Sequence, residues 1–315
     1  MKLSRERVGQ AIGVAGTAAG LFVFIANPSF PTPDKLIIFL FFFMMIFKQA
    51  FFVLKRLLPF VAILLVYDSF RGIADNLNTH VNYTFMIGAD RFLFGDLPTV
   101  TLQNWLWNGH IQWFDIALYL PYMLHFVLPV GMAIVIWENR RKHYWNYVAA
   151  FSIVSFAAFF TFILFPAAPP WLAVENGYIE DIRRISSDVW LSLGISDFPS
   201  VYNQISPNPV AAMPSLHAAW AILLYIFVLK LYGRGWGLLA LSYPLVISFV
   251  VVYQGEHYVI DALAGIAYAL GAYFSAPYLV RLIERKITPL LRRHHYAKAH
   301  AKKQMTAKQK IAGSL

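Results

Sequence analysis

Residues 213–220 read MPSLHAAW and residues 255–265 read GEHYVIDALAG. Each stretch opens an apolar run long enough to cross a lipid bilayer, and each places one histidine, His217 or His257, at the mouth of that run. Asp261 follows His257 by four residues, and on a helix such residues lie about 40° apart around the axis. The carboxylate is therefore expected beside the imidazole, where it can accept the proton of one ring nitrogen and leave the other nitrogen free to attack.

The composition of the chain is that of a membrane protein. Of its 315 residues, 59% are hydrophobic and 13% are charged. Apolar runs near the ~20 residues needed to span a bilayer recur from end to end, and they are too long and too unalternating for barrel strands. The chain has no cysteine, which excludes disulfides and thiolate metal sites. We therefore predict an all-α, polytopic integral membrane helix bundle.

About eight transmembrane helices are expected. The run after the basic N-terminus is interpreted as an uncleaved helix, because residues 25–28 (IANP) form a poor signal-peptide cleavage site. Residues 80–110 are too polar to span and too aromatic for a free loop, which indicates a segment lying in the membrane interface. The expected spans are 8–27, 34–54, 57–74, 111–137, 144–165, 211–230, 235–253 and 257–282.

Basic residues in alternate turns predict the orientation of these spans. The positive-inside rule puts both termini in the cytoplasm and both histidine motifs on the extracytoplasmic face of a plasma or inner membrane. The same face receives the long connection of residues 166–210. The basic segments are the N-terminus, residues 55–56, 140–143 and 230–234, and the C-terminal tail.

Two motifs resemble a known enzyme family. Residues 214–217 (PSLH) resemble the PSGH signature of the type-2 phosphatidic acid phosphatase superfamily, and His257-x-x-x-Asp261 resembles its terminal HxxxD. Residues 166–171 (PAAPPW) and 67–72 (YDSFRG) are similar to the inositol phosphorylceramide synthase-like branch, so the resemblance runs from Tyr67 to Gly265. It implies a six-helix catalytic core.

One position departs from the family pattern. The superfamily motif carries an arginine six residues before its second histidine, and this chain has Val251 there. The arginine that would hold the phosphate is therefore missing from that motif. Other bases must neutralise the charge of the equatorial oxygens.

The candidate site follows from these motifs. His257, oriented by Asp261, is the expected nucleophile, and His217 is the expected acid and base. Pro214 suits the first turn of a helix, where backbone N–H groups bind anions, and Ser215 is expected to donate its hydroxyl to the same phosphate. A metal site of two histidines and one aspartate is a weaker reading, because a helix entrance attracts an anion.

The remaining candidates are less specific. Asp90 and His80 lie in the interfacial segment, where packing or helix-capping is as plausible as substrate binding. His125 and Lys48 are ionisable groups within expected spans. Arginines expected to bind the phosphate are Arg71, first, then Arg91, Arg183 and Arg184. Side chains expected to shape an acceptor pocket are Tyr253, Gln254, Glu256 and Trp171.

The expected activity is transfer of a phospho-headgroup from a membrane phospholipid to a lipid or alcohol hydroxyl, through a phosphohistidine. Hydrolysis of a lipid or polyprenyl phosphate is the alternative, and a non-catalytic lipid-phosphate transporter is the second. No cofactor, metal or nucleic acid is expected. The chain divides into two N-terminal helices (1–56), the catalytic core (57–283) and a basic tail (284–315) expected to bind anionic inner-leaflet lipid.

Overall fold

The structure of the chain is a computed structural model that describes residues 5–26, 33–47, 57–58, 60–64, 66–67, 70, 77–193 and 208–312. Helices make up most of these ranges, and the β-pairing among them consists of two isolated bridges. The longer helices are α1 (Arg5–Ala26), α2 (Pro33–Ile46), α7 (Trp113–Asn139), α8 (Tyr144–Leu164), α12 (Leu216–Tyr232), α13 (Arg234–Tyr253) and α14 (Val259–Ala312). Short helices are α5 (Thr84–Phe94), α6 (Pro98–Leu106), η1 (Arg141–His143), α9 (Pro170–Glu175) and α10 (Ile185–Ser192).

The prediction of an all-α integral membrane protein is confirmed. Four helices of the described residues are long and apolar enough to cross a bilayer, and α7 makes a fifth if its two halves form one span. α12 is apolar but only 17 residues long, and α2 has 14 residues. The expected third span, residues 57–74, lies partly outside the described residues, so the count of eight stays a prediction.

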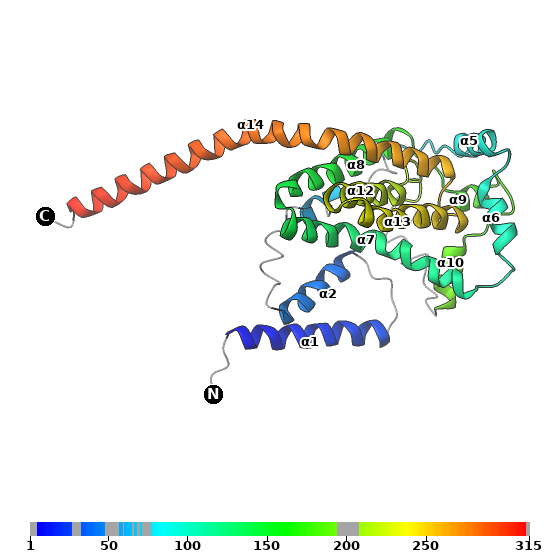
Figure 1. Cartoon of the computed structure of the whole chain (residues 1–315), viewed down its shortest axis with the longest axis horizontal. Coiled ribbons are helices and arrows are strands. Elements are labelled where there is room, and N and C mark those ends of the chain that lie inside the picture. The colour runs from blue at the N-terminus through cyan, green and yellow to red at the C-terminus, as the bar shows by residue number, and fades with distance from the viewer. Residues whose placement is uncertain are drawn as a thin grey trace.

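The core of the bundle is formed by α7, α8, α12, α13 and α14. α12 is central, since it packs against each of the other four helices. Its buried aromatic side chains, Trp220 and Phe227, meet Tyr147 and Phe151 of α8 in one continuous apolar cluster. Figure 1 shows α12 between α8 and α13, with α14 lying along the same bundle.

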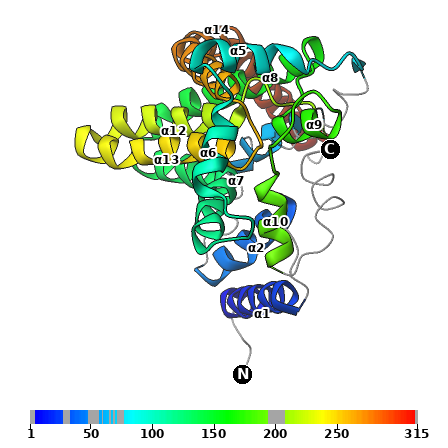
Figure 2. The same ribbon diagram turned by 90° about the vertical axis from the view of Figure 1, so that its right-hand side faces the viewer.

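The two ends of the bundle differ in what they carry. At one end, the basic turns of α7/α8 and α12/α13 come together, and Arg140 Nε donates to the carbonyl of Leu231 at 3.4 Å. At the other end, α5, α6, α9 and α10 gather around the first turns of α12 and α14 (Figures 1 and 2). Both histidine motifs therefore lie at the end that the short helices cover.

Candidate active site

The two motif histidines meet. His217 Nδ1 lies 3.2 Å from His257 Nε2, which is hydrogen-bonding distance. On the far side of the His257 ring, Nδ1 lies 3.4 Å from Asp261 Oδ2. The side chains of His257 and Asp261 are 8% and 0% exposed, so the contact is shielded from water. A carboxylate, an imidazole and a second imidazole thus form one chain of polar contacts.

Local sequence places His217 in the first turn of α12. Ser215 is the N-cap: its backbone is extended, and its Oγ accepts from the N–H of Ala218 at 3.5 Å. Serine suits this position because its hydroxyl satisfies a helix N–H group that has no partner within the helix. Pro214 precedes the cap, so the expectation that it occupies the first helical turn is wrong.

His257 does not lie inside a helix, as the motif spacing suggested, because α14 begins two residues later at Val259. It belongs to a short turn after α13, where the N–H groups of Glu256 and His257 both donate to the carbonyl of Val251, at 2.9 and 3.0 Å. Asp261 still faces the ring. Its Oδ2 accepts a hydrogen bond from the N–H of Tyr258 at 2.9 Å, which holds the carboxylate beside His257. The residue that replaces the family arginine, Val251, is fully buried.

Asp90 supplies the cap of α14 from a distant part of the chain. Its two oxygens accept from the N–H groups of Val259 and Ile260, each at 2.9 Å. Asp90 is fully buried on α5. Burial raises the pKa of its carboxyl, and the two backbone hydrogen bonds oppose that rise. Of the three roles considered for Asp90 (packing, helix-capping and substrate binding), these contacts support helix-capping.

The entrances of α12 and α14 are joined directly. The N–H of Ser215 donates to the backbone carbonyl of Asp261 at 2.9 Å. One turn further along α14 is Gly265, where an added Cβ would lie 2.2 Å from the carbonyl oxygen of Ser215. Only glycine permits this approach without a backbone shift. The distance between the two histidines therefore depends on the absence of one side chain.

The turn that carries His257 is held from outside by an ion pair. Both nitrogens Nε and Nη2 of Arg184 donate to the carboxylate of Glu256, at 2.9 and 3.3 Å. Ser186 donates to the same carboxylate, and the guanidinium of Arg184 lies 3.9 Å from the ring centre of Trp171. Trp171 in turn donates its backbone N–H to the carbonyl of Gly255 at 3.3 Å. These contacts surround the turn that carries His257.

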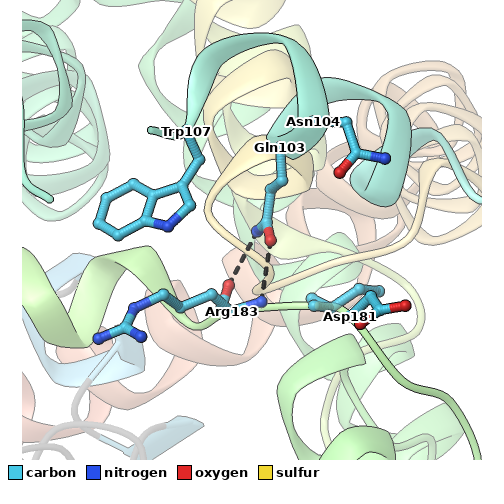
Figure 3. A pocket seen from close by; sticks show the side chains of 6 residues that line it. Gln103, Asn104, Trp107, Asp181 and Arg183 are labelled. Atoms are coloured by element: carbon cyan, nitrogen blue, oxygen red, sulfur yellow. Dashed lines mark hydrogen bonds between the residues drawn. The ribbon is translucent and has the colours of Figure 1, made fainter. Parts of the chain in front are cut away.

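Gln103 of α6 links the same turn to the connection after α8. Its Nε2 donates to the carbonyls of Arg183 and Tyr253, both at 2.8 Å, and its Oε1 accepts from the N–H of Arg183 at 2.8 Å. Figure 3 shows Gln103 pointing down from α6 to the backbone of Arg183. A hollow of about 370 Å³ lies here, and neither motif histidine lines it: its lining is Gln103, Asn104, Trp107, Asp181, Ile182 and Arg183.

The four side chains expected to shape an acceptor pocket all lie around the His257 turn. Tyr253 is fully buried and its hydroxyl donates to Asp115 Oδ1 at 2.7 Å, while Gln254 is equally buried. Glu256 and Trp171 are 5% and 8% exposed. In this structure their visible effect is to hold the turn in place.

The candidate phosphate-binding arginines differ in their surroundings. Arg71 lies outside the described residues. Arg183 pairs with Asp188, and that hydrogen bond raises the pKa of its guanidinium. Arg184 is committed to Glu256. Arg91 is exposed at the end of α5, forms no ion pair with the described carboxylates, and lies near enough to Tyr258 for its charge to lower the pKa of that phenol against the rise from burial.

PAAPPW supports the site through its backbone. Ala167 is fully buried and bridges both Asn82 and Ala211. Its N–H donates to the carbonyl of Val210 at 2.7 Å, and its carbonyl accepts from the N–H of Ala212 at 3.2 Å. The segment therefore fixes the strand-like lead into PSLH.

Two residues at this end of the bundle were not found from the sequence. Asp115 is fully buried near the start of α7 and holds Tyr253. Gln103 is 5% exposed on α6 and holds the turn carbonyls. An acid within an apolar span was a usable signal for Asp115. Gln103 gave none, since a glutamine in an interfacial helix is ordinary.

Two imidazoles in contact, with a carboxylate beside one of them, at the joined entrances of two helices form a site suited to nucleophilic and acid–base chemistry. The sequence profile of the PAP2 superfamily matches residues 84–275, more than half of the chain. The chain belongs to that superfamily. It is a multi-pass membrane enzyme of the phosphatase and phosphotransferase type, which confirms the resemblance inferred from PSLH and HxxxD.

Two relatives refine the comparison. The phosphoinositol dihydroceramide synthase of Bacteroides thetaiotaomicron is 26% identical over 225 residues, which cover 68% of this chain and 73% of that protein. The inositol phosphorylceramide synthase catalytic subunit AUR1 of Saccharomyces cerevisiae is 24% identical over 273 residues, covering 78% of this chain and 62% of that protein. No solved structure matches the chain.

Proposed function

We propose that this protein is a lipid phosphotransferase that moves a phospho-headgroup from a phospholipid to a hydroxyl acceptor through a phosphohistidine. The contact of 3.2 Å between His217 Nδ1 and His257 Nε2 carries the proposal. With the Asp261 carboxylate facing His257 Nδ1, that nitrogen holds the ring proton and Nε2 presents a lone pair. His217 Nδ1 then carries a proton toward the same point.

The reaction has two steps with a balanced transfer of protons. In the first, His257 Nε2 bonds to phosphorus, the phosphorus–oxygen bond to the lipid breaks, and His217 gives its proton to the departing alcohol. In the second, His217 takes the proton of the acceptor hydroxyl, that oxygen bonds to phosphorus, and the phosphorus–nitrogen bond breaks. The headgroup is now on the acceptor, and both histidines are restored.

Positive charge for the phosphoryl oxygens comes from several sources in this proposal. The entrance of α12 offers N–H groups and the Ser215 hydroxyl. Arg91 is the described arginine most free to move toward a phosphate, and Arg71 stays the first choice from the motif. Arg183 and Arg184 are assigned to holding the connection, because each is engaged by a carboxylate.

The names of both relatives suggest the substrates. Each describes a synthase of an inositol phosphate-bearing ceramide, so we infer a phosphoinositol headgroup and a ceramide-like acceptor. In the membrane, the histidines would face the extracytoplasmic side and both termini the cytoplasm, as the basic turns predict. The basic tail would then meet anionic lipid of the inner leaflet.

The test uses purified protein in lipid vesicles with a phospholipid labelled in its phosphoinositol group. We expect a new labelled lipid only when ceramide is present, and a loss of at least about a thousand-fold in His257→Ala. His217→Ala should lose about 10²–10⁴-fold. His110→Ala, an exposed histidine outside the site, is the matched control and should keep full activity.

Two outcomes would favour the alternatives. Inorganic phosphate released from a labelled lipid phosphate monoester, without any new labelled lipid, would identify a phosphatase. Transport of labelled lipid across the vesicle that persists in His257→Ala, with no product formed, would identify a transporter.

A further inference from the structure

A third histidine lies against the motif pair. His125 belongs to α7 and is 4% exposed, and its ring centre lies 4.4 Å from that of His217. The same imidazole stacks on Trp220, one turn further along α12, with ring centres 4.5 Å and planes 14° apart. His125 thus contacts two successive rings on one face of α12. The two-step reaction proposed above assigns it no role.

Local sequence explains why α7 changes direction at this residue. Pro129 stands four residues after His125 and has no N–H to bond the carbonyl of His125, which its ring also crowds. α7 accordingly bends by 50° between the half that ends at His125 and the half that begins at Val127. The kink falls beside the imidazole.

The stack is anchored at both ends. Trp220 Nε1 donates to Ser155 Oγ of α8 at 3.2 Å, which fixes the indole. Tyr147, also of α8, donates its hydroxyl to the carbonyl of Pro129 at 2.8 Å, which fixes the second half of α7. Tyr122, one turn before His125, adds a second ring against His217 with centres 4.6 Å apart. His217 is therefore oriented by side chains that are themselves held.

Burying an imidazole costs more desolvation free energy than burying an apolar ring of similar size, so packing alone does not explain His125. A phenylalanine ring would fill a buried position without the desolvation cost of two ring nitrogens. His125 touches His217 at a kink in the apolar middle of α7, so we explain this imidazole by its effect on His217.

We propose that His125 is a positioning residue, which holds the imidazole plane of His217 so that Nδ1 points at the reacting centre. The inference rests on the proposed function, in which His217 moves the proton in both steps. Since a misplacement of ~1 Å costs on the order of a hundredfold in rate, a ring that fixes this plane affects turnover more than substrate binding.

The first test compares ring removal with ring replacement. We expect His125→Ala to lower kcat by about tenfold or more while KM stays within about twofold. His125→Phe keeps a stacking ring and should recover part of kcat. The control is Phe227→Ala, which removes a ring that is 2% exposed and so opens a cavity in the core. Phe227 lies on α12, the helix of His217, ten residues further along. It should lower the melting temperature but keep kcat per folded molecule.

The second test asks whether His125 acts through His217. In the double variant H125A/H217A, kcat should equal that of H217A, because no proton transfer remains to be oriented. With a nitrophenyl phosphodiester, whose leaving group needs no proton, the first-step defects of H125A and H217A should shrink together. A purely structural defect would not depend on the leaving group.

Unchanged kcat in His125→Ala would overturn the inference, as would additive losses in the double variant. A kcat loss in Phe227→Ala equal to that of His125→Ala would also overturn it. Activity retained in His257→Ala would instead overturn the proposed function. The two failures are therefore distinguishable in one set of variants.

Discussion

The helices α12 and α14 each bring one histidine to the site, but their N-termini are built in different ways. α12 is capped by its own sequence, through Ser215, and His217 lies inside its first turn. α14 is capped by its own Asp261 and by Asp90, which is 169 residues away in sequence. His257 lies ahead of the helix, in a turn.

The difference separates two tasks. At α14, carboxylates already accept hydrogen bonds from the N–H groups of Tyr258, Val259 and Ile260. This entrance therefore holds His257, the proposed nucleophile, and has few N–H groups left to bind an anion. α12 has an entrance capped by a neutral hydroxyl, which leaves its positive end for a phosphate. The locally capped terminus of α12 is suited to binding a phosphate. The terminus of α14, which is held by distant residues, is suited to orienting His257.

The largest expected effect comes from breaking the ion pair between Arg184 and Glu256, which holds the His257 turn ahead of α14. Arg184→Ala leaves the carboxylate of Glu256, which is 5% exposed, without its cation, and should lower the free energy of unfolding by about 3–5 kcal/mol. Its neighbour Arg183 is the matched control, since its side chain is 58% exposed and its replacement should cost less than about 1 kcal/mol. Denaturant unfolding in detergent micelles measures both.

Equal losses in the two arginine variants would contradict the view that the α14 entrance depends on this pair. The double variant Arg184→Ala with Glu256→Gln should recover part of the loss, because no unpaired charge then remains buried.

A smaller effect is expected where the two entrances touch. Gly265→Ala would press a Cβ against the carbonyl of Ser215 at 2.2 Å, so we expect a loss of about 1–3 kcal/mol and a separation of the histidines that lowers kcat by about a hundredfold. Gly271→Ala, on the same helix with no atom within 4 Å, should instead be neutral or slightly stabilising. Similar activities in both variants would refute the close approach.

The smallest effect concerns the long-range cap. Asp90→Ala removes the acceptor of two α14 N–H groups and should cost about 0.5–2 kcal/mol. Burial raises the pKa of Asp90 above 3.8, so the folded state holds this proton more tightly than the unfolded state. The stability that Asp90 contributes is thus fullest below that value and falls as the pH rises through the raised pKa.

The free energy of unfolding should be measured for the wild type and for Asp90→Asn at a series of pH values from below the ordinary pKa of Asp90 to above its raised pKa. The free energy of the wild type, relative to that of the variant, should fall as the pH rises. Glu175→Gln, an exposed carboxylate, serves as the control and should run parallel to the wild type. A difference that grows with pH would contradict the assignment.

The sequence predicted the parts of the site that depend on local pattern. The apolar runs located the long helices, and the two histidine motifs were correctly placed at meeting helix entrances. Asp261 was expected beside His257 because of helical spacing, and it lies there although His257 precedes the helix. The turn after α13, not helical periodicity, places the ring.

The remainder depends on contacts between distant residues, which leave no periodic signal. Asp90 caps α14 through Val259, which lies 169 residues further along the chain. Arg184 pairs with Glu256, which lies 72 residues further along. The need for glycine at position 265 appears only when the Ser215 carbonyl is seen beside it. His125 looked like one polar residue in a span, and its meaning depends on a ring from another helix.

The hydrogen bond between the two motif imidazoles has a consequence for the idle enzyme. At 3.2 Å the proposed nucleophile, His257 Nε2, and the proposed acid, His217 Nδ1, contact each other, and a phosphorus atom with its departing oxygen has no room between them. In the proposed reaction, binding of the donor phospholipid therefore has to separate the two imidazole rings. The same binding event then exposes Nε2 of His257 for attack.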